Sequence, residues 1–208
     1  VILFGEHAVV YGSHALAAPV SLNIQARIKE QSEGEDLSIP RWGVEQHITL
    51  DGRRENSLRA SLGLILEKLE LKDRSMLIEV WPHVPRAMGM GASAALAVAV
   101  IRALSEQYGL NLNDTDVNGL AFEVEKLAHG TPSGIDNTLA TYRKFLLFKK
   151  GEPPLMKEVS APKPIPIVLG LSGTESLTAA MVAKVRRQWE NNRYLYERIF
   201  AEIDGLTL

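Results

Sequence analysis

The sequence of 208 residues contains no cysteine, which excludes disulfide bonds and thiolate metal sites. This absence favours a reducing compartment, and we expect a cytoplasmic protein. There is no excess of one charge either, because 23 basic residues balance 25 acidic ones for a net charge of -2. That balance gives no electrostatic reason to expect nucleic acid or an anionic membrane as a partner. The longest strongly apolar stretch, Ala94–Ala103, is too short to span a bilayer.

Two common nucleotide-binding patterns are also absent. No Gly-x-x-x-x-Gly-Lys-Ser/Thr sequence occurs, which excludes a Walker A loop. The dinucleotide pattern Gly-x-Gly-x-x-Gly is incomplete, because Ala94 stands at its third glycine. The first residue is Val1 rather than Met and opens directly into an expected strand. We therefore expect the native start to lie upstream.

Hydrophobic periodicity predicts a mixture of strands and helices. Strands are predicted over 1–4, 21–29, 44–50, 75–81, 144–149 and 166–171, and helices over 57–69, 92–108, 114–129, 174–189 and 192–203. The run 44–50 ends in Asp51-Gly52, which favours an antiparallel hairpin, whereas 31–36 is predicted to be a polar turn. Hairpins followed by interspersed helices favour an α+β fold with a mixed sheet. Prolines at 153–154 and within 162–166 predict a domain boundary near residue 160.

A glycine-rich loop, Pro85–Ala95, connects a predicted strand to a long apolar helix. Gly89 and Gly91 allow the backbone to approach a ligand closely and to adopt positive φ. The free N–H groups at the helix start, together with the helix dipole, form an anion site. Ser93, in the first turn, could reach a Mg²⁺ ion bound to a phosphate. Taken alone, a flexible and closely packed turn explains this loop equally well.

A second segment places two carboxylates on either side of a tight turn. Glu125 lies near the end of one predicted helix, and Asp136 follows the turn at 130–134 and precedes a short helix. Phosphoryl transfer requires one carboxylate to hold the metal and another to orient the hydroxyl and accept its proton. Considered singly, Glu125 is more simply a solvated helix residue and Asp136 a carboxylate favoured by a helix dipole. Among the histidines, His7 beside Glu6 is the better candidate for a polar ligand contact.

Three segments together resemble a known family. Residues 1–12 resemble the amino-terminal motif of mevalonate kinases, and the loop 85–95 resembles the phosphate motif of the wider GHMP kinase superfamily. Residues 129–137 are similar to the catalytic turn of mevalonate kinases. The order and spacing of the segments also match. The resemblance implies an ATP- and Mg²⁺-dependent kinase that converts mevalonate to 5-phosphomevalonate for isoprenoid biosynthesis.

The same resemblance implies a role for each candidate residue. Asp136 would be the catalytic base near the acceptor hydroxyl, while Ser93 and Glu125 would hold Mg²⁺. The loop that would wrap the ATP phosphates consists of Gly89, Met90, Gly91, Ala92 and Ser93, and the acceptor would be bound by Glu6, His7 and Thr131.

The resemblance further implies a two-domain fold. Residues 1–160 would form an amino-terminal domain like domain 2 of ribosomal protein S5. Residues 161–208 would begin a ferredoxin-like carboxyl-terminal domain that is incomplete here. ATP and the acceptor would meet in the cleft between the domains. A homodimer is expected by family analogy alone.

Three departures from the family pattern leave alternatives open. A Lys expected before Val1 and a Gly-rich motif expected beyond Leu208 lie outside this sequence. Within the phosphate loop, the family's usual residues are replaced by Ala87, Met88, Met90 and Ala92. Replacement of Ser by Ala92 removes one hydroxyl donor. The alternatives are another GHMP kinase, acting on phosphomevalonate, a sugar or an amino-acid alcohol, and a non-catalytic sensor with the same fold.

Overall fold

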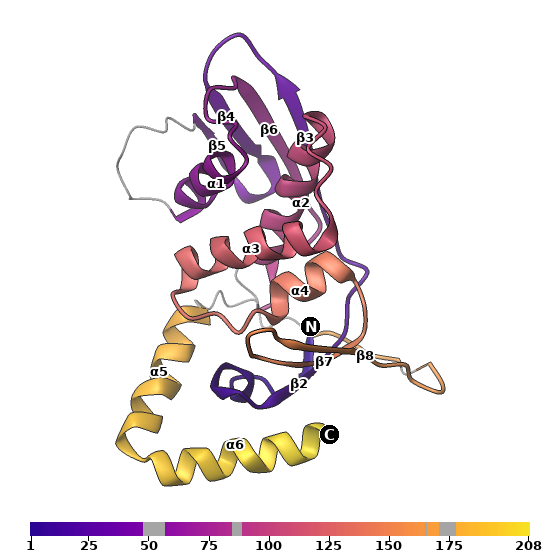
Figure 1. Cartoon of the computed structure of the whole chain (residues 1–208), viewed down its shortest axis with the longest axis vertical. Helices are drawn as coiled ribbons and strands as arrows, with labels where there is room; N and C mark the ends of the chain where they lie inside the picture. The colour runs from indigo at the N-terminus through magenta and orange to yellow at the C-terminus, as the bar shows by residue number, and fades with distance from the viewer. Residues whose placement is uncertain (48–56, 85–88, 165, 171–177) are drawn as a thin grey trace.

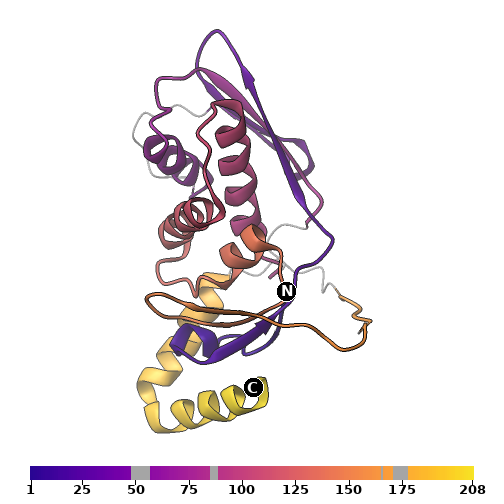
Figure 2. The same cartoon turned by 45° about the vertical axis from the view of Figure 1, so that its right-hand side comes forward.

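The computed structural model describes residues 1–47, 57–84, 89–164, 166–170 and 178–208. These residues form two four-stranded sheets and six α-helices in an elongated arrangement (Figures 1 and 2). The first sheet contains, in spatial order, β3 (Ile24–Glu30), β6 (Met76–Pro82), β4 (Glu35–Ile39) and β5 (Val44–His47). β4 and β6 run parallel, and the other neighbouring strands run antiparallel. The expected α+β class with a mixed sheet is therefore confirmed.

Helices cover one face of this sheet, as Figure 2 shows. They are α1 (Ser57–Lys68), α2 (Ala92–Gln107) and α3 (Asp114–His129). Because side chains alternate along a strand, Met76, Ile78 and Val80 of β6 all point into this core and are fully buried. On α2, Ile101 and Leu104 meet them and are equally buried. This main core sets the positions of the α2 and α3 ends that line the candidate site.

A second, smaller sheet lies beyond the helices (Figure 1). Its antiparallel strands are β1 (Ile2–Phe4), β2 (His14–Ala17), β7 (Leu146–Lys149) and β8 (Leu155–Glu158). α4 (Ile135–Tyr142) packs on it through Ile135 and Leu139, which meet Phe148 of β7 in a separate small core. α4 therefore connects the two layers, and its first turn lies between them.

The corner between β1 and β2 is unusually tight. A short 3₁₀ helix, η1 (Ala8–Tyr11), fills it, and Gly5 precedes η1 with a φ of 87°. A Cβ atom at Gly5 would lie only 2.1 Å from the carbonyl oxygen of His14. No larger residue fits there without moving the backbone. The absence of a side chain thus allows the corner to rest directly on β2.

Two further helices form an arm at the lower end of Figure 1. α5 (Thr178–Asn191) and α6 (Arg193–Thr207) meet at Asn192, whose Oδ1 accepts a hydrogen bond from Leu195 N at 3.2 Å. α6 contacts β1, β2 and η1. Within the described ranges, these and all other helices lack the length and apolar character needed to cross a bilayer.

Most predicted elements are confirmed within a few residues, but some predictions were wrong. The strand predicted over 166–171 does not form, since 166–170 carry no regular structure and 171 lies outside the described residues. Proline cannot donate to a strand ladder, and Pro162, Pro164 and Pro166 fall in or beside this run. The polar turn predicted over 31–36 gives way to a strand at Glu35.

Three short strands, β2, β4 and β8, were missed. β5 does pair antiparallel, but with the unpredicted β4, and that hairpin turns at Pro40–Gly43. The predicted Asp51-Gly52 turn lies outside the described residues, as do the positions 85–88 and the predicted start of α5 at 174–177.

Candidate active site

A cavity of about 660 Å³ opens between the start of α2, the end of α3 and the start of α4. Its volume is in the range of small-molecule sites. All ten site residues predicted from the sequence line it: Glu6, His7, Gly89, Met90, Gly91, Ala92, Ser93, Glu125, Thr131 and Asp136. They come from three segments that are far apart in the sequence, 6–7, 89–93 and 125–136, so the fold brings them together.

The phosphate loop approaches the Asp136 side chain closely. Gly91 precedes α2 with a φ of 64°, and a Cβ atom built on it would lie 3.1 Å from Asp136 Oδ1. The first backbone hydrogen bond of α2 runs from Ala95 N to Gly91 O at 3.0 Å. The amides before Ala95 are therefore not used by the helix. Such amides, reinforced by the helix dipole, suit a phosphate group.

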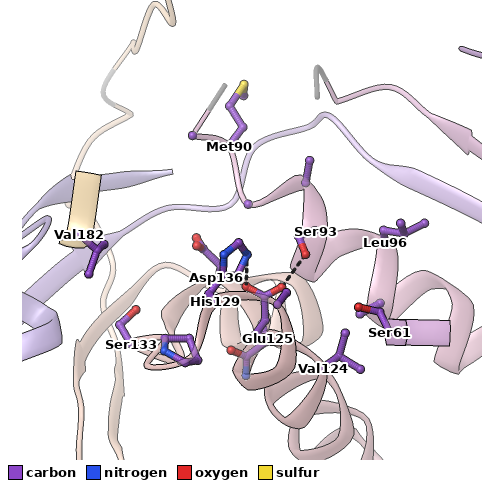
Figure 3. A pocket seen from close by; sticks show the side chains of 18 of the residues that line it. Ser61, Met90, Ser93, Leu96, Val124, Glu125, His129, Ser133, Asp136 and Val182 are labelled. Atoms are coloured by element: carbon purple, nitrogen blue, oxygen red, sulfur yellow. Dashed lines mark hydrogen bonds and ion pairs between the residues drawn. The ribbon is translucent and has the colours of Figure 1, made fainter. Parts of the chain in front are cut away.

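Ser93 and Glu125 form a direct contact across the cavity. The Ser93 hydroxyl donates a hydrogen bond to Glu125 Oε1 at 2.7 Å, and Figure 3 shows the two side chains pointing toward each other. His129 Nε2 lies 3.7 Å from Glu125 Oε2, one helical turn further along α3. Only 5% of Glu125 is exposed. The carboxylate is thus held in place by neighbours on two sides.

The donor set at this contact fits Mg²⁺, which prefers oxygen ligands. Among the described residues, no three His, Asp or Glu side chains gather in a group that could hold a metal alone. Mg²⁺ commonly binds through one or two protein ligands and completes its shell with water and substrate phosphates. The Ser93–Glu125 pair beside a phosphate loop matches that kind of site.

Asp136 lies in the first turn of α4 and is partly exposed to the cavity. Burial raises the pKa of Asp136 to about 6, and the negative charge of Glu125 adds to the effect. The next residue, Asn137, is 2% exposed and donates to Asn118 Oδ1 at 2.7 Å. This bond fixes the start of α4 against α3. A firmly placed carboxyl group with a pKa near neutrality is suited to accepting a proton.

The corner after β1 brings Glu6 and His7 to the same cavity. His7 adopts a φ of 60° and a ψ of −49°, a conformation that is rare and strained for a non-glycine residue. Hydrogen bonds hold this turn, from Ala8 N to Glu6 O at 2.7 Å and from Val9 N to Gly5 O at 3.0 Å. Backbone strain of this kind is concentrated at functional sites. The corner is therefore a good place for contacts to a ligand.

Sequence reasoning missed the apolar lining of the cavity. One wall consists of Trp42, Val44, Leu58, Leu62, Ile65, Leu96 and Val124, and another of Ala180, Met181 and Val182 on α5. In Figure 3, Leu96 lies on one side of the Ser93–Glu125 contact, and Val182 and Ser133 lie on the other. These residues come from separate elements and form no local motif. The recurrence of Leu58, Leu62 and Ile65 at helical spacing within the predicted helix 57–69 was an available signal.

Comparisons with known proteins give a consistent set of relatives. The profile of the GHMP kinases N terminal domain matches residues 56–145. The mevalonate kinase of Thermococcus sibiricus is 35% identical, and the match covers all of this chain and 65% of that protein. The mevalonate kinase of Archaeoglobus fulgidus is 30% identical, with coverage of 100% and 68%.

A solved structure agrees with these relatives. The crystal structure of L. major mevalonate kinase in complex with R-mevalonate is 29% identical, with a TM-score of 0.71. The match covers 98% of this chain and 63% of that one. This chain thus spans slightly less than two thirds of the length of several relatives.

Proposed function

We propose, since this chain belongs to the mevalonate kinase family of the GHMP kinases, that it transfers the γ-phosphoryl group of ATP to the hydroxyl of mevalonate. The product would be 5-phosphomevalonate, a precursor for isoprenoid biosynthesis. One observation supports this proposal above the others. The buried Glu125 and the partly exposed Asp136 meet the glycine loop and Ser93 in one cavity. Phosphoryl transfer requires this combination of metal ligand, base and phosphate cradle.

Asp136 is proposed as the catalytic base. Its carboxylate would accept a hydrogen bond from the acceptor hydroxyl and orient the oxygen toward the γ-phosphorus. It would take up the proton as the new P–O bond forms and the bond from the γ-phosphorus to the bridging oxygen breaks, releasing ADP. The raised pKa favours that uptake, because a carboxylate with a pKa of about 6 binds a proton more readily than an ordinary one. Above pH 6 the group is ionised and ready to act.

The loop from Gly89 to Ser93 is proposed to bind the ATP phosphates through its backbone amides. Ser93 and Glu125 would hold Mg²⁺, which supplies positive charge against the phosphate oxygens when it is bound. Catalysis would then consist mainly of positioning and charge stabilisation. Ala92 contributes no hydroxyl, so Ser93 is the hydroxyl group of this first helical turn.

The two ends of the cavity suit the two substrates. Trp42 belongs to the apolar lining of the cavity, and we assign this end to the nucleobase because flat rings stack on aromatic side chains. The acceptor would lie at the opposite end, against Glu6, His7 and Thr131. The division into domains at residue 160, the homodimer and the cytoplasmic location stay predictions.

Removal of the base is the sharpest test of the proposed reaction. Asp136→Asn in the whole protein should lower kcat roughly 10²–10⁴-fold, the usual contribution of a general base, while ATP still binds. The measurement is coupled ADP release with mevalonate, together with calorimetric titration of a nucleotide. Asp73→Asn is the matched control, since Asp73 is exposed and outside the cavity. Equal turnover of the two variants would remove Asp136 from the reaction.

A panel of acceptors tests the substrate. Mevalonate, phosphomevalonate, a hexose and homoserine should be compared at one ATP concentration, with ADP release as the signal. We expect mevalonate to give the highest kcat/KM. Turnover of another alcohol in its place would reassign the acceptor, and nucleotide binding without turnover of any would favour the sensor alternative.

A further inference from the structure

The α5–α6 arm contributes a wall to the same cavity as the β1–η1 corner. Ala180, Met181 and Val182 of α5 line the cavity together with Glu6 and His7. In Figure 3, Val182 lies on the side of Ser133 and Asp136, away from Leu96. The proposed function assigns this side to the acceptor. The position of the arm therefore influences the space that the acceptor can occupy.

An aromatic cluster holds the arm to the corner. Tyr11, the last residue of η1, stacks on Phe200 of α6 with ring centroids 4.5 Å apart and planes 17° apart. Its ring also meets Trp189 of α5 at 5.3 Å. Phe200 is only 7% exposed, although most of the arm is exposed. Aromatic pairs of this kind add to the energy of burial, so one side chain fastens both helices of the arm.

Polar contacts reinforce the cluster on its β2 side. The Ser13 hydroxyl donates to the carbonyl oxygen of Phe200 at 3.3 Å. Asp204 Oδ1 accepts from the backbone N–H of His14 and lies 2.9 Å from His14 Nδ1. The backbone N–H of His14, followed by its side chain, holds the pKa of Asp204 below its usual range. The Asp204 carboxylate is therefore ionised and bound at neutral pH.

Tyr11 lies four residues after His7 in one continuous turn. The N–H of Val10 donates to His7 O at 3.0 Å, and Gly12 N donates to Val9 O at 3.3 Å. The turn is short and its residues are hydrogen-bonded to one another, so a displacement of Tyr11 also displaces His7. A rigid connection thus runs from the arm to the proposed acceptor contacts.

From these observations we infer that Tyr11 is a positioning residue, and that the clamp of Tyr11, Trp189 and Phe200 sets the width of the acceptor end. The inference rests on the proposed function. Tyr11, Trp189 and Phe200 are not among the described residues that line the cavity, so the clamp acts on the acceptor end through the corner and leaves nucleotide binding unchanged. The aromatic ring carries the role, because packing fixes the arm.

The test compares three variants of the whole protein. Tyr11→Leu removes the ring, Tyr11→Phe keeps it, and Tyr194→Leu makes the same chemical change at a residue of the arm that is 82% exposed. We expect Tyr11→Leu to raise KM for the acceptor about tenfold or more, since small misplacements at a site have large effects, with KM for ATP unchanged. The other two variants should behave as the wild type. Asp204→Ala, which breaks the clamp from the arm side, should reproduce a smaller part of the effect.

Hydrogen exchange supplies a readout independent of turnover. Tyr11→Leu should speed amide exchange across 193–207 while α2 and α3 keep their protection. Faster exchange with an unchanged acceptor KM would overturn the inference, as would equal rises of both KM values or a loss in Tyr11→Phe as large as in Tyr11→Leu. A wild-type protein that turns over no acceptor would instead refute the proposed function, so the two failures are distinguishable.

Discussion

The two ends of the cavity differ in how their side chains are held. At the apolar end, Leu62, Ile65 and Leu96 belong to the main core, so the wall is simply the edge of the packing that folds the protein. At the polar end, Glu125 is buried and Asp136 is partly buried, and both burial and the negative charge of Glu125 oppose the ionised form of Asp136. The fold therefore supplies the first end as a by-product, whereas the second end is kept at a cost in stability.

Among the changes that compare the two ends, the largest effect is expected at the polar end, where the glycine loop comes closest to Asp136. Gly91→Ala puts a methyl group 3.1 Å from Asp136 Oδ1 and should lower kcat/KM roughly 10²-fold by displacing the carboxylate. Gly89→Ala is the matched control, because its φ of 68° is similar but, among the described residues beyond its chain neighbours, nothing lies within 4 Å of the added Cβ. Steady-state kinetics should show a clearly smaller loss for Gly89→Ala. If both variants lost kcat/KM equally, the cause would be the backbone conformation and not the contact with Asp136.

A second change tests the role of Glu125 separately from that of Asp136. Glu125→Gln keeps the shape but removes the charge, so the Mg²⁺ concentration at half-maximal activity should rise about 10–100-fold. The measurement is a magnesium titration at fixed ATP. Glu123→Gln, on the same helix but exposed and paired with Lys126, should titrate as the wild type does. An unaltered magnesium curve in Glu125→Gln would argue against its role as a ligand.

The apolar end is tested by removing its aromatic residue. Trp42→Ala should raise KM for ATP about tenfold with kcat nearly unchanged, since stacking on a base contributes about 1–3 kcal/mol. Trp81→Ala makes the same change on β6, at a partly exposed position outside the cavity lining. The comparison would fail if Trp42→Ala lowered kcat instead, because the apolar wall would then act on chemistry and not on binding alone.

The smallest expected effect concerns the cost of the polar end. The folded-state pKa of Asp136, about 6, lies above its ordinary value of 3.8, so the folded protein loses stability from this group as pH rises from about 4 to 6. At pH 7.5, Asp136→Asn should therefore have a free energy of unfolding about 1–3 kcal/mol larger than that of the wild type, and a higher melting temperature. Calorimetric melts at pH 4 and 7.5 check this, with Asp73→Asn as control. If the stability difference between Asp136→Asn and the wild type does not grow from pH 4 to pH 7.5, the raised pKa of Asp136 is contradicted.

The residues of the polar end could be singled out from the sequence, because each of its parts is local. The spacing of Gly89, Gly91 and Ser93 is readable in one loop, and the distance from Glu125 to Asp136 in one turn. Their meeting in one cavity depends on how α2, α3 and α4 pack, which no single segment encodes. Family resemblance, rather than spacing, linked the segments before the structure did.

The apolar end and the short strands were not predictable in the same way. Trp42, Leu58 and Leu96 come from three elements and become neighbours only through tertiary packing. β8 consists of four exposed residues, and β4 begins with two acidic ones, so neither shows a clear hydrophobic alternation. Conversely, the apolar run after Pro166 suggested a strand that proline chemistry opposes.

Gly5 has a consequence for how variants of this protein will be interpreted. Since the corner carrying Glu6 and His7 touches the His14 carbonyl at this point, any side chain here would act as a wedge under the acceptor contacts. Such a variant would show weak acceptor binding, although Gly5 itself does not line the cavity. A genetic screen would score Gly5 as a residue that binds the acceptor, although its contribution is only to leave space where a Cβ atom would clash with the His14 carbonyl oxygen.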